Sequence, residues 1–359
     1  MPITSSSPFS IVVRAAAKTV PSTAPITDTL TLLSGTSQGV VSTIYPLGAT
    51  RDSTGEFWMV WDATFIASPV AGDKNNMPWT SIGTGTWEAH YENTRPHSDP
   101  ATDRVWILGG GTPGGSAAHD RNGATSYFDW ASRTYVLPPR QVNSVPNRIS
   151  ASSGAALGIW DGSMYVFGGF ANVNGVVGRL VLSPVYSPQW QEVSVSGAVF
   201  PDTAGLDITR YTMFRGGVDR RTGQLWYLDK DASLWIFNHD GVTGTWVHLP
   251  VFGTVPPLGE SNVACVSASL NEKMNCIVAF MSINAVPQAT PQAHVNKIFV
   301  LDLGTLMWRT STIACPVDTT VPAMVTYYDR HFQRTMFAAY DQGVGKTKLY
   351  AFEPGAGPL

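Results

Sequence analysis

The chain of 359 residues is long enough to bury a large core, in one large β domain or in two domains of ordinary size. Its 43% hydrophobic and 14% charged residues exclude a disordered protein, because disorder combines low hydrophobicity with high charge. The net charge of -3 argues against a sequence-independent nucleic-acid binder, which needs a basic face.

The N-terminal segment shows no signal for export or membrane insertion. Residues 1–8 are polar and Arg14 interrupts the apolar run at 11–17, so no secretory leader is expected. No apolar stretch approaches about 18 residues, so no transmembrane segment is expected either. Two short segments that read as strands lie here, at residues 10–14 and 29–33.

Six apolar strands then recur along the chain, in which helical periodicity is hard to find. Their second residues are Trp58, Trp106, Tyr165, Trp226, Cys276 and Met336. The spacing of about 50 to 60 residues matches units of four strands, as in the blades of a propeller. A further strand and a tight turn with Asp or Asn precede each of them, which predicts a hairpin between the first two strands of each unit.

Third and fourth strands follow, and an aromatic residue such as Trp190 or Trp308 opens the fourth. Two of the second strands end in a diglycine, at Gly109-Gly110 and Gly168-Gly169, which the other four units lack. This combination resembles the kelch motif, in which a diglycine closes the second strand and aromatic residues bracket the third and fourth. The resemblance covers about residues 40–359 and implies a fold, with almost no function attached.

The sixth unit has three strands before the sequence ends, so one of the two N-terminal segments is expected to supply its outermost strand. The predicted fold class is therefore all-β: a six-bladed, kelch-like β-propeller of four-stranded blades, closed by an N-terminal strand. Residues 1–39 form an N-terminal arm that includes this strand, and residues 40–359 form the propeller.

No cofactor and no metal ion is predicted. The glycine-rich run at residues 109–114 is followed by no helix that could bind a dinucleotide, and no histidine pair has metal-ligand spacing.

Cys265 and Cys276 are expected to face each other across one hairpin, as buried free thiols or as a disulfide, with the free thiols favoured. The run Thr50-x-Asp52-x-x-Gly55 resembles the Asp box of sialidase-type propellers, a structural turn.

Five long segments rich in Gly and Pro all fall on one face of such a propeller: residues 111–124, 138–153, 197–209, 251–261 and 282–296. Because loops on a rigid scaffold often carry function, this face is the predicted interaction face. The residues proposed there are Thr112, His119, Asp120, Arg121, Pro287, Gln292 and His294. Trp79, Trp87, Trp130 and Trp160 are further candidates, for stacking on a glycan.

Low charge, a surface rich in Ser, Thr, Gly and Pro, and the missing export signal favour a non-catalytic structural or binding propeller in a virion. Tail nozzle and hub proteins of tailed bacteriophages include propellers of this kind, so the chain resembles them. The expected partners are other virion proteins or further copies of the chain, and a host-surface glycan or protein. Sequence-specific nucleic-acid binding and membrane insertion are not expected, and a cytoplasmic location is the alternative.

Two other functions stay open. A glycan-active enzyme, such as a sialidase-like hydrolase or a sugar epimerase, would place carboxylates and arginines at the centre of one face. The candidates for that role are Arg140, Arg148, Asp202, Asp207 and Arg210. A kelch-type protein-interaction module is the third possibility.

Overall fold

The computed structural model describes residues 27–34, 47–60, 66–69, 79–83, 96–108, 125–136, 138–139, 155–168, 175–187, 189–200, 213–259, 263–284, 294–313, 324–341 and 346–355. Within these residues the chain forms 26 β-strands and no helix, which confirms the prediction of an all-β protein. It follows that the described part of the chain contains no helix able to cross a membrane.

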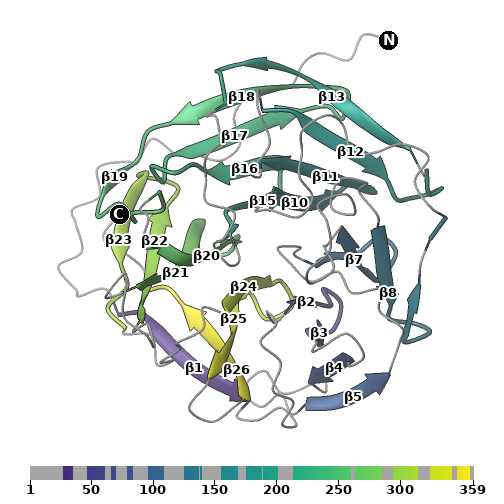
Figure 1. Ribbon diagram of the computed structural model, residues 1–359, viewed down its shortest axis with the longest axis horizontal. Helices are drawn as coiled ribbons and strands as arrows, with labels where there is room; N and C mark the ends of the chain where they lie inside the picture. Colours follow the sequence, from purple (N-terminus) through teal and green to yellow (C-terminus); the bar gives the residue numbers. More distant parts are fainter. Residues whose placement is uncertain are drawn as a thin grey trace.

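The strands form antiparallel groups of four that surround a common centre (Figure 1). We call these groups units and number them along the described chain. Unit 1 contains β2 (Leu47–Thr50), β3 (Phe57–Val60), β4 (Ile66–Pro69) and β5 (Trp79–Gly83). Unit 2 contains β6 (His97–Asp99), β7 (Arg104–Leu108), β8 (Thr125–Asp129) and β9 (Thr134–Val136).

The next two units follow the same order. Unit 3 contains β10 (Ala155–Trp160), β11 (Ser163–Gly168), β12 (Val177–Val181) and β13 (Trp190–Gly197). Unit 4 contains β15 (Gly216–Asp219), β16 (Gln224–Leu228), β17 (Leu234–His239) and β18 (Thr243–Leu249).

The last two units complete the circle. Unit 5 contains β20 (Val263–Asn271), β21 (Cys276–Asn284), β22 (His294–Asp302) and β23 (Met307–Thr310). Unit 6 contains β24 (Met324–Asp329), β25 (Arg334–Asp341), β26 (Lys346–Glu353) and β1 (Thr29–Ser34). The first strands of units 1, 3, 4, 5 and 6 lie nearest the centre, an arrangement compatible with a β-propeller (Figure 1).

Three parallel pairings connect neighbouring units. Outer strand β13 of unit 3 pairs with outer strand β18 of unit 4, which joins the two units into one sheet of eight strands. Strand β14 (Met213–Phe214) precedes unit 4 in the chain but pairs with β20 of unit 5. Strand β19 (Phe252–Gly253) follows unit 4 and pairs with β23. Backbone hydrogen bonds therefore cross between units at both their inner and their outer strands.

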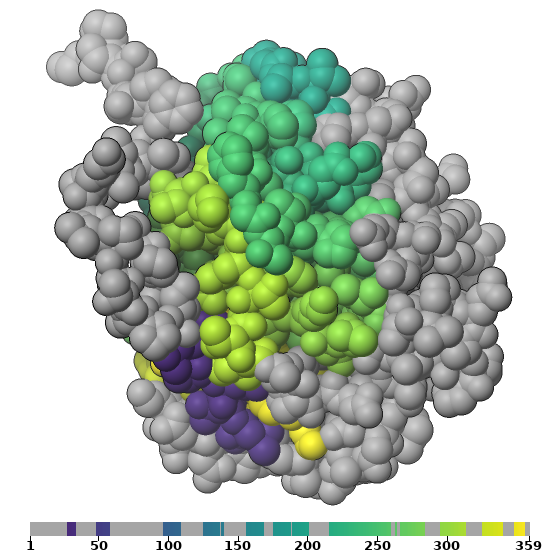
Figure 2. Space-filling model, turned by 90° about the vertical axis from the view of Figure 1, so that its left-hand side faces the viewer, coloured from purple at the N-terminus to yellow at the C-terminus, as the bar shows by residue number. Residues whose placement is uncertain are grey.

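The N-terminal strand β1 is the outermost strand of unit 6, where Thr29 lies opposite Glu353 of β26. Of the two segments expected to fill this position, residues 29–33 therefore occupy it, while residues 10–14 lie outside the described residues. Figure 2 shows the outer wall of the molecule, with this purple strand against the yellow-green residues of unit 5.

Asp28, directly before β1, ties the N-terminal strand to unit 5 and to the C-terminal segment. Its carboxylate accepts hydrogen bonds from the Arg309 guanidinium at 2.7 and 2.9 Å, and from the Ser311 hydroxyl at 2.7 Å. The backbone N–H groups of Thr312 and Gly355 also donate to it, at 3.0 and 2.8 Å. Burial alone would raise the pKa of Asp28, but these donors outweigh it and lower the pKa to about 2. We call these five residues the Asp28 anchor.

Tryptophans in the fourth strands pack between units in a repeated way. Trp246 of unit 4 and Trp308 of unit 5 are both buried. The indole N–H of Trp246 donates to the Gly175 carbonyl at 2.8 Å, and that of Trp308 donates to the Ala232 carbonyl at 3.1 Å. Both acceptors precede the third strand of the preceding unit. Because the middle strands are covered on both faces, they read as continuous apolar runs in the sequence.

The prediction that Cys265 faces Cys276 is wrong. Only four residues form the turn between β20 and β21, so Cys276 lies opposite Asn271, whereas Cys265 lies opposite Ser282. The two cysteines are therefore about 20 Å apart along the hairpin, at about 3.3 Å per residue, which excludes a disulfide. Cys276 is a buried free thiol, and its burial raises its pKa to about 12.

Candidate functional site

The turn between the first and second strands of a unit has a recurring construction. In units 2, 4, 5 and 6 an Asp or Asn ends the first strand, four residues follow, and the last of them has a positive φ. The Asx side chain accepts a backbone N–H inside the turn, as Asp219 does from Arg221 at 3.0 Å. These turns lie at one end of the ring, which we call the turn face, and the opposite end is the loop face.

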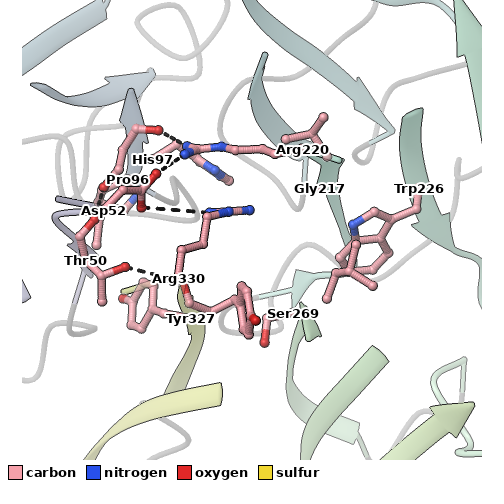
Figure 3. Close-up of a pocket in the computed structure, with 15 residues that line it drawn as sticks. Thr50, Asp52, Pro96, His97, Gly217, Arg220, Trp226, Ser269, Tyr327 and Arg330 are labelled. Carbon is pink, nitrogen blue, oxygen red and sulfur yellow. Dashed lines mark hydrogen bonds and ion pairs between the residues drawn. The ribbon is translucent and has the colours of Figure 1, made fainter. Parts of the chain in front are cut away.

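The residue that follows the Asx is held at the same place in each of these turns. It is Pro100 in unit 2 but a charged residue in the other three turns: Arg220 in unit 4, Glu272 in unit 5 and Arg330 in unit 6. The longer turn of unit 1 adds Asp52. All four side chains converge near the centre of the turn face, although they come from turns that are far apart in the sequence. Figure 3 shows three of them, Asp52, Arg220 and Arg330. We call these four residues the charged quartet.

Charges of opposite sign alternate around the quartet. Arg330 pairs with Glu272 at 2.6 Å and with Asp52 at 4.0 Å. Arg220 pairs with Asp52 through its guanidinium, and its backbone N–H donates to Glu272 at 3.4 Å. The Arg220 guanidinium also donates to the backbone carbonyl of Ser98 in unit 2. The quartet therefore connects five of the six units across the centre of the ring.

Burial gives Arg220 an unusual electrostatic environment. Removal of its guanidinium from water lowers the pKa of Arg220 to about 10, and the nearby charge of Arg330 acts in the same direction. The carboxylates of Asp52 and Glu272 oppose this shift. Arg220 therefore stays charged at neutral pH, and its charge is paired with that of Asp52 within the quartet.

Beside the quartet lies a cavity of about 70 Å³ that we call the central cavity (Figure 3). Four of its lining residues have a buried polar atom without a hydrogen-bond partner: Asp52 Oδ1, Arg220 Nε, Trp226 Nε1 and Ser269 Oγ. Buried polar groups of this kind normally bind ordered water. Because ligand pockets have volumes of about 300–1,000 Å³, the central cavity suits a few water molecules rather than an organic ligand.

A larger hollow of about 660 Å³ adjoins Arg220 on the turn face, and we call it the turn-face groove. It lies between the turns of units 2 and 3. Its lining residues are Asp99, Pro100, Ala101, Ile159, Trp160, Asp161, Gly162, Ser183, Pro184 and Arg220. Its volume is in the range of ligand pockets.

Trp160 is the aromatic side chain among the residues that line this groove, and its indole packs against Gly223 and His239. Gly223 has a φ of +77°, and a Cβ there would lie 2.5 Å from the indole, so the glycine permits close packing against the ring. The His239 ring meets the indole edge-on at 5.8 Å. His239 in turn hydrogen-bonds the Gly223 carbonyl at 2.9 Å, and burial lowers the pKa of His239, which keeps it neutral. A half-buried, fixed indole thus lines the groove beside the exposed carboxylate of Asp161.

Comparisons with known proteins bear on the fold. No protein-family model matches the sequence, and no curated protein matches it. The chain is similar to a solved structure described as "Structure of YjhT", with a TM-score of 0.54 and 12% sequence identity. The match covers 87% of this chain and 93% of the other. At this identity the similarity shows the fold alone.

The residues predicted for the interaction face are largely untested. Thr112, His119, Asp120, Arg121, Pro287 and Gln292 lie outside the described residues, and so do the enzyme candidates Arg140, Arg148, Asp202, Asp207 and Arg210. His294 opens β22 opposite Asn284, at the loop-face end of unit 5. Within the described ranges, no three His, Cys, Asp or Glu side chains are placed to bind a metal ion.

Among the four tryptophans considered for glycan stacking, Trp160 lines the turn-face groove. Trp130 is buried and meets Phe128 edge-on at 5.1 Å. Trp79 lies in β5, and Trp87 lies outside the described residues. Sequence reasoning missed the charged quartet: an alignment of the turns on their Asx residues places Arg220, Glu272 and Arg330 at one position, but it shows neither Asp52 nor the contacts among the four residues.

Proposed function

We propose that the chain is a six-bladed, kelch-like β-propeller that binds neutral glycans in the turn-face groove. The observation that carries the proposal is the groove itself, where a fixed indole and a carboxylate line a hollow of about 660 Å³. A sugar ring presents an apolar C–H face to an aromatic side chain and hydroxyl groups to a carboxylate. The blade assignment is supported by the six units of four strands and by the repeated tryptophan contacts between them.

The charges around the groove favour a neutral sugar over an acidic one. Asp161 is exposed and can accept hydrogen bonds from sugar hydroxyl groups. The Arg220 guanidinium, in contrast, already donates hydrogen bonds to Asp52 and to the Ser98 carbonyl. Asp99 accepts the Ala101 N–H at 3.1 Å and the Thr102 hydroxyl at 2.7 Å, so it shapes the groove edge. A carboxylate on the ligand would therefore meet two fixed negative charges and no unengaged cation.

Binding without catalysis is the form of this function that the charged residues support. The carboxylates and arginines of the charged quartet form ion pairs with one another. None of these four side chains is therefore unpaired and positioned to act on a substrate as an acid, base or nucleophile. The glycan-active enzyme stays the alternative. Incubation with oligosaccharides and analysis of the products separates the two, because an enzyme would change the sugar and a binding protein would not.

The test uses the full chain and a panel of neutral trisaccharides: cellotriose, maltotriose and chitotriose. Saturable binding of at least one by isothermal titration calorimetry is expected, and Trp160→Ala should weaken it at least tenfold, because truncation removes the stacking surface. The matched control is Val242→Ser, an exposed apolar residue of a turn on the same face but outside the groove. Absence of binding, or equal affinity in wild type and Trp160→Ala, would refute the proposal.

A virion role in a tailed bacteriophage remains a second proposal, and its support is compositional. The 14% charged residues suit a protein that functions outside a cell. In that setting the partners would be other virion proteins or further copies of the chain, and the groove would receive a host-surface glycan. Mass spectrometry of purified particles tests it, and absence of the chain from the particles would contradict it.

A further inference from the structure

Arg215 is a buried arginine that forms no ion pair with any described residue. It lies between β14 and β15 and is 1% exposed, yet its Nε and Nη1 atoms have no hydrogen-bond acceptor. Strand β15 runs from here toward the turn face, so Arg215 lies at the loop-face end of unit 4. The turn-face groove and the charged quartet are at the opposite end of the same strand.

The other arginines of the described residues all have a hydrogen-bond or ion-pair partner. They are Arg51, Arg104, Arg133, Arg179, Arg220, Arg221, Arg309, Arg330 and Arg334. A buried charge that lacks a partner costs several kcal/mol. Folded proteins retain such a group where something else compensates the charge, so Arg215 is suited to bind an anion.

A second unpartnered donor lies beside it. The Arg215 guanidinium lies 5.6 Å from the centre of the Tyr227 ring, and the Tyr227 hydroxyl is also buried without a hydrogen-bond partner. Tyr227 is fixed by the Phe200 ring at 5.2 Å and by Gly168, where a Cβ would lie 2.6 Å from the phenol ring. The Arg215 guanidinium and the Tyr227 ring therefore lie together in a rigid apolar surrounding, and each side chain carries a buried polar group without a hydrogen-bond partner.

No carboxylate of the described chain pairs with this arginine. Asp229 follows Leu228, whose N–H donates to the Arg215 carbonyl at 2.7 Å, but Asp229 has its own donors. Its oxygens accept the backbone N–H groups of Asp231 and Ser233 and the indole N–H of Trp235, each at 2.9 Å. Asp229 therefore stabilises its own turn.

We propose that Arg215 and the Tyr227 hydroxyl form a binding site for an oxyanion, the carboxylate, phosphate or sulfate group of a ligand, at the loop face of unit 4. A guanidinium and a phenol supply charge-assisted hydrogen bonds to such a group, which are strong where water is excluded. The site goes beyond the proposed glycan binding, because it lies at the other end of the ring and uses none of the groove residues.

The test measures unfolding and binding of the full chain in chloride buffer, with phosphate, sulfate or acetate added at constant ionic strength. The variants are Arg215→Gln and Tyr227→Phe. In chloride alone, Arg215→Gln should be at least as stable as the wild type, because it removes an uncompensated charge. Addition of the recognised anion should stabilise the wild type most, Tyr227→Phe less and Arg215→Gln not at all, since a ligand stabilises only the state that binds it. Acetate reports a planar carboxylate, whereas phosphate and sulfate report a tetrahedral group.

Calorimetric titration gives the second readout. The wild type should bind one equivalent of anion, Tyr227→Phe should bind it about tenfold more weakly through loss of one hydrogen bond, and Arg215→Gln should not bind it. Neutral-trisaccharide binding should be unchanged in both variants, so failure here is distinguishable from failure of the glycan proposal. Two results would overturn the site: no anion binds the wild type, or Arg215→Gln is destabilised equally with and without anion.

Discussion

Two ionic clusters join distant parts of this chain, and they are built differently. In the Asp28 anchor a single carboxylate accepts hydrogen bonds from the side chains of Arg309, Ser311 and Thr312 and from two backbone N–H groups. In the charged quartet two carboxylates and two guanidinium groups alternate, yet Asp52 Oδ1 and Arg220 Nε have no hydrogen-bond partner. The protein itself supplies the hydrogen-bond partners of the Asp28 carboxylate. The quartet instead borders the central cavity, whose size suits a few water molecules as partners for its unpaired atoms.

The pKa values reflect this difference. Donors around Asp28 overcome its burial and lower its pKa to about 2, so the charged form is the favoured one. Around Arg220 burial prevails and lowers the pKa to about 10, so the surroundings do not fully compensate the charge. A cluster in which every polar atom has a partner within the protein is typical of a structural contact. A cluster with unpartnered buried polar atoms is typical of a place that binds water or a ligand.

The largest effect should come from removal of the carboxylate of the anchor. Asp28→Ala leaves Arg309 without its partner and releases the start of β1, so the free energy of unfolding should fall by about 3–5 kcal/mol. Urea denaturation measures the change, and limited proteolysis should cut first near the start of β1. The control is Asp231→Ala, which breaks the exposed pair with Lys230 and should leave the urea midpoint unchanged.

Acid should weaken the anchor over a defined range. Because folding lowers the pKa of Asp28 from 3.8 to about 2, its contribution is fully present above pH 4 and is lost as the pH falls through 2. That contribution is about 2 kcal/mol. The stability difference between wild type and Asp28→Asn should therefore shrink between pH 5 and pH 2. A difference that stays constant over this range would show that Asp28 does not titrate in the expected way.

The quartet should be less sensitive than the anchor. Glu272→Gln removes the charge that Arg330 contacts at 2.6 Å, but these side chains are 13% and 25% exposed, so water compensates part of the loss. We expect a fall of about 1–2 kcal/mol in the free energy of unfolding. A double-mutant cycle with Arg330→Met should give a coupling energy of about 1 kcal/mol. A coupling near zero would mean that the pair does not hold the units together.

Two serine variants give the smallest and most direct contrast. Ser311 donates to Asp28 at 2.7 Å, so Ser311→Ala should cost about 1 kcal/mol in unfolding free energy. Ser269 is also buried, but its hydroxyl has no partner in the protein, so Ser269→Ala should change stability by less than about 0.5 kcal/mol. Equal effects in the two variants would show that a protein partner for the buried hydroxyl makes no difference to stability, and would contradict the contrast between the anchor and the central cavity.

The repeating strands were predictable because their apolar residues recur at a nearly constant spacing. The Asx residues of the turns could also be recognised, since Asp219 and Asp329 stand directly before the expected turn residues. What the sequence could not supply was the meeting of Asp52, Arg220 and Arg330, because their contact depends on the closure of the ring. The same applies to Asp28, whose partners lie near the far end of the chain. The cysteine error had a local origin, since the length of one turn sets the register of the hairpin.

The parallel pairing of β13 with β18 has a consequence for how such a chain can evolve. Repeat proteins change size when a repeat is duplicated or deleted between neighbours that contact each other in equivalent ways. At this junction the outer strands of units 3 and 4 exchange backbone hydrogen bonds, from Ser194 opposite Thr243 to Gly197 opposite Trp246. A unit inserted between them would break that ladder, so gain or loss of a unit should be tolerated less readily here than at a junction that no such ladder crosses.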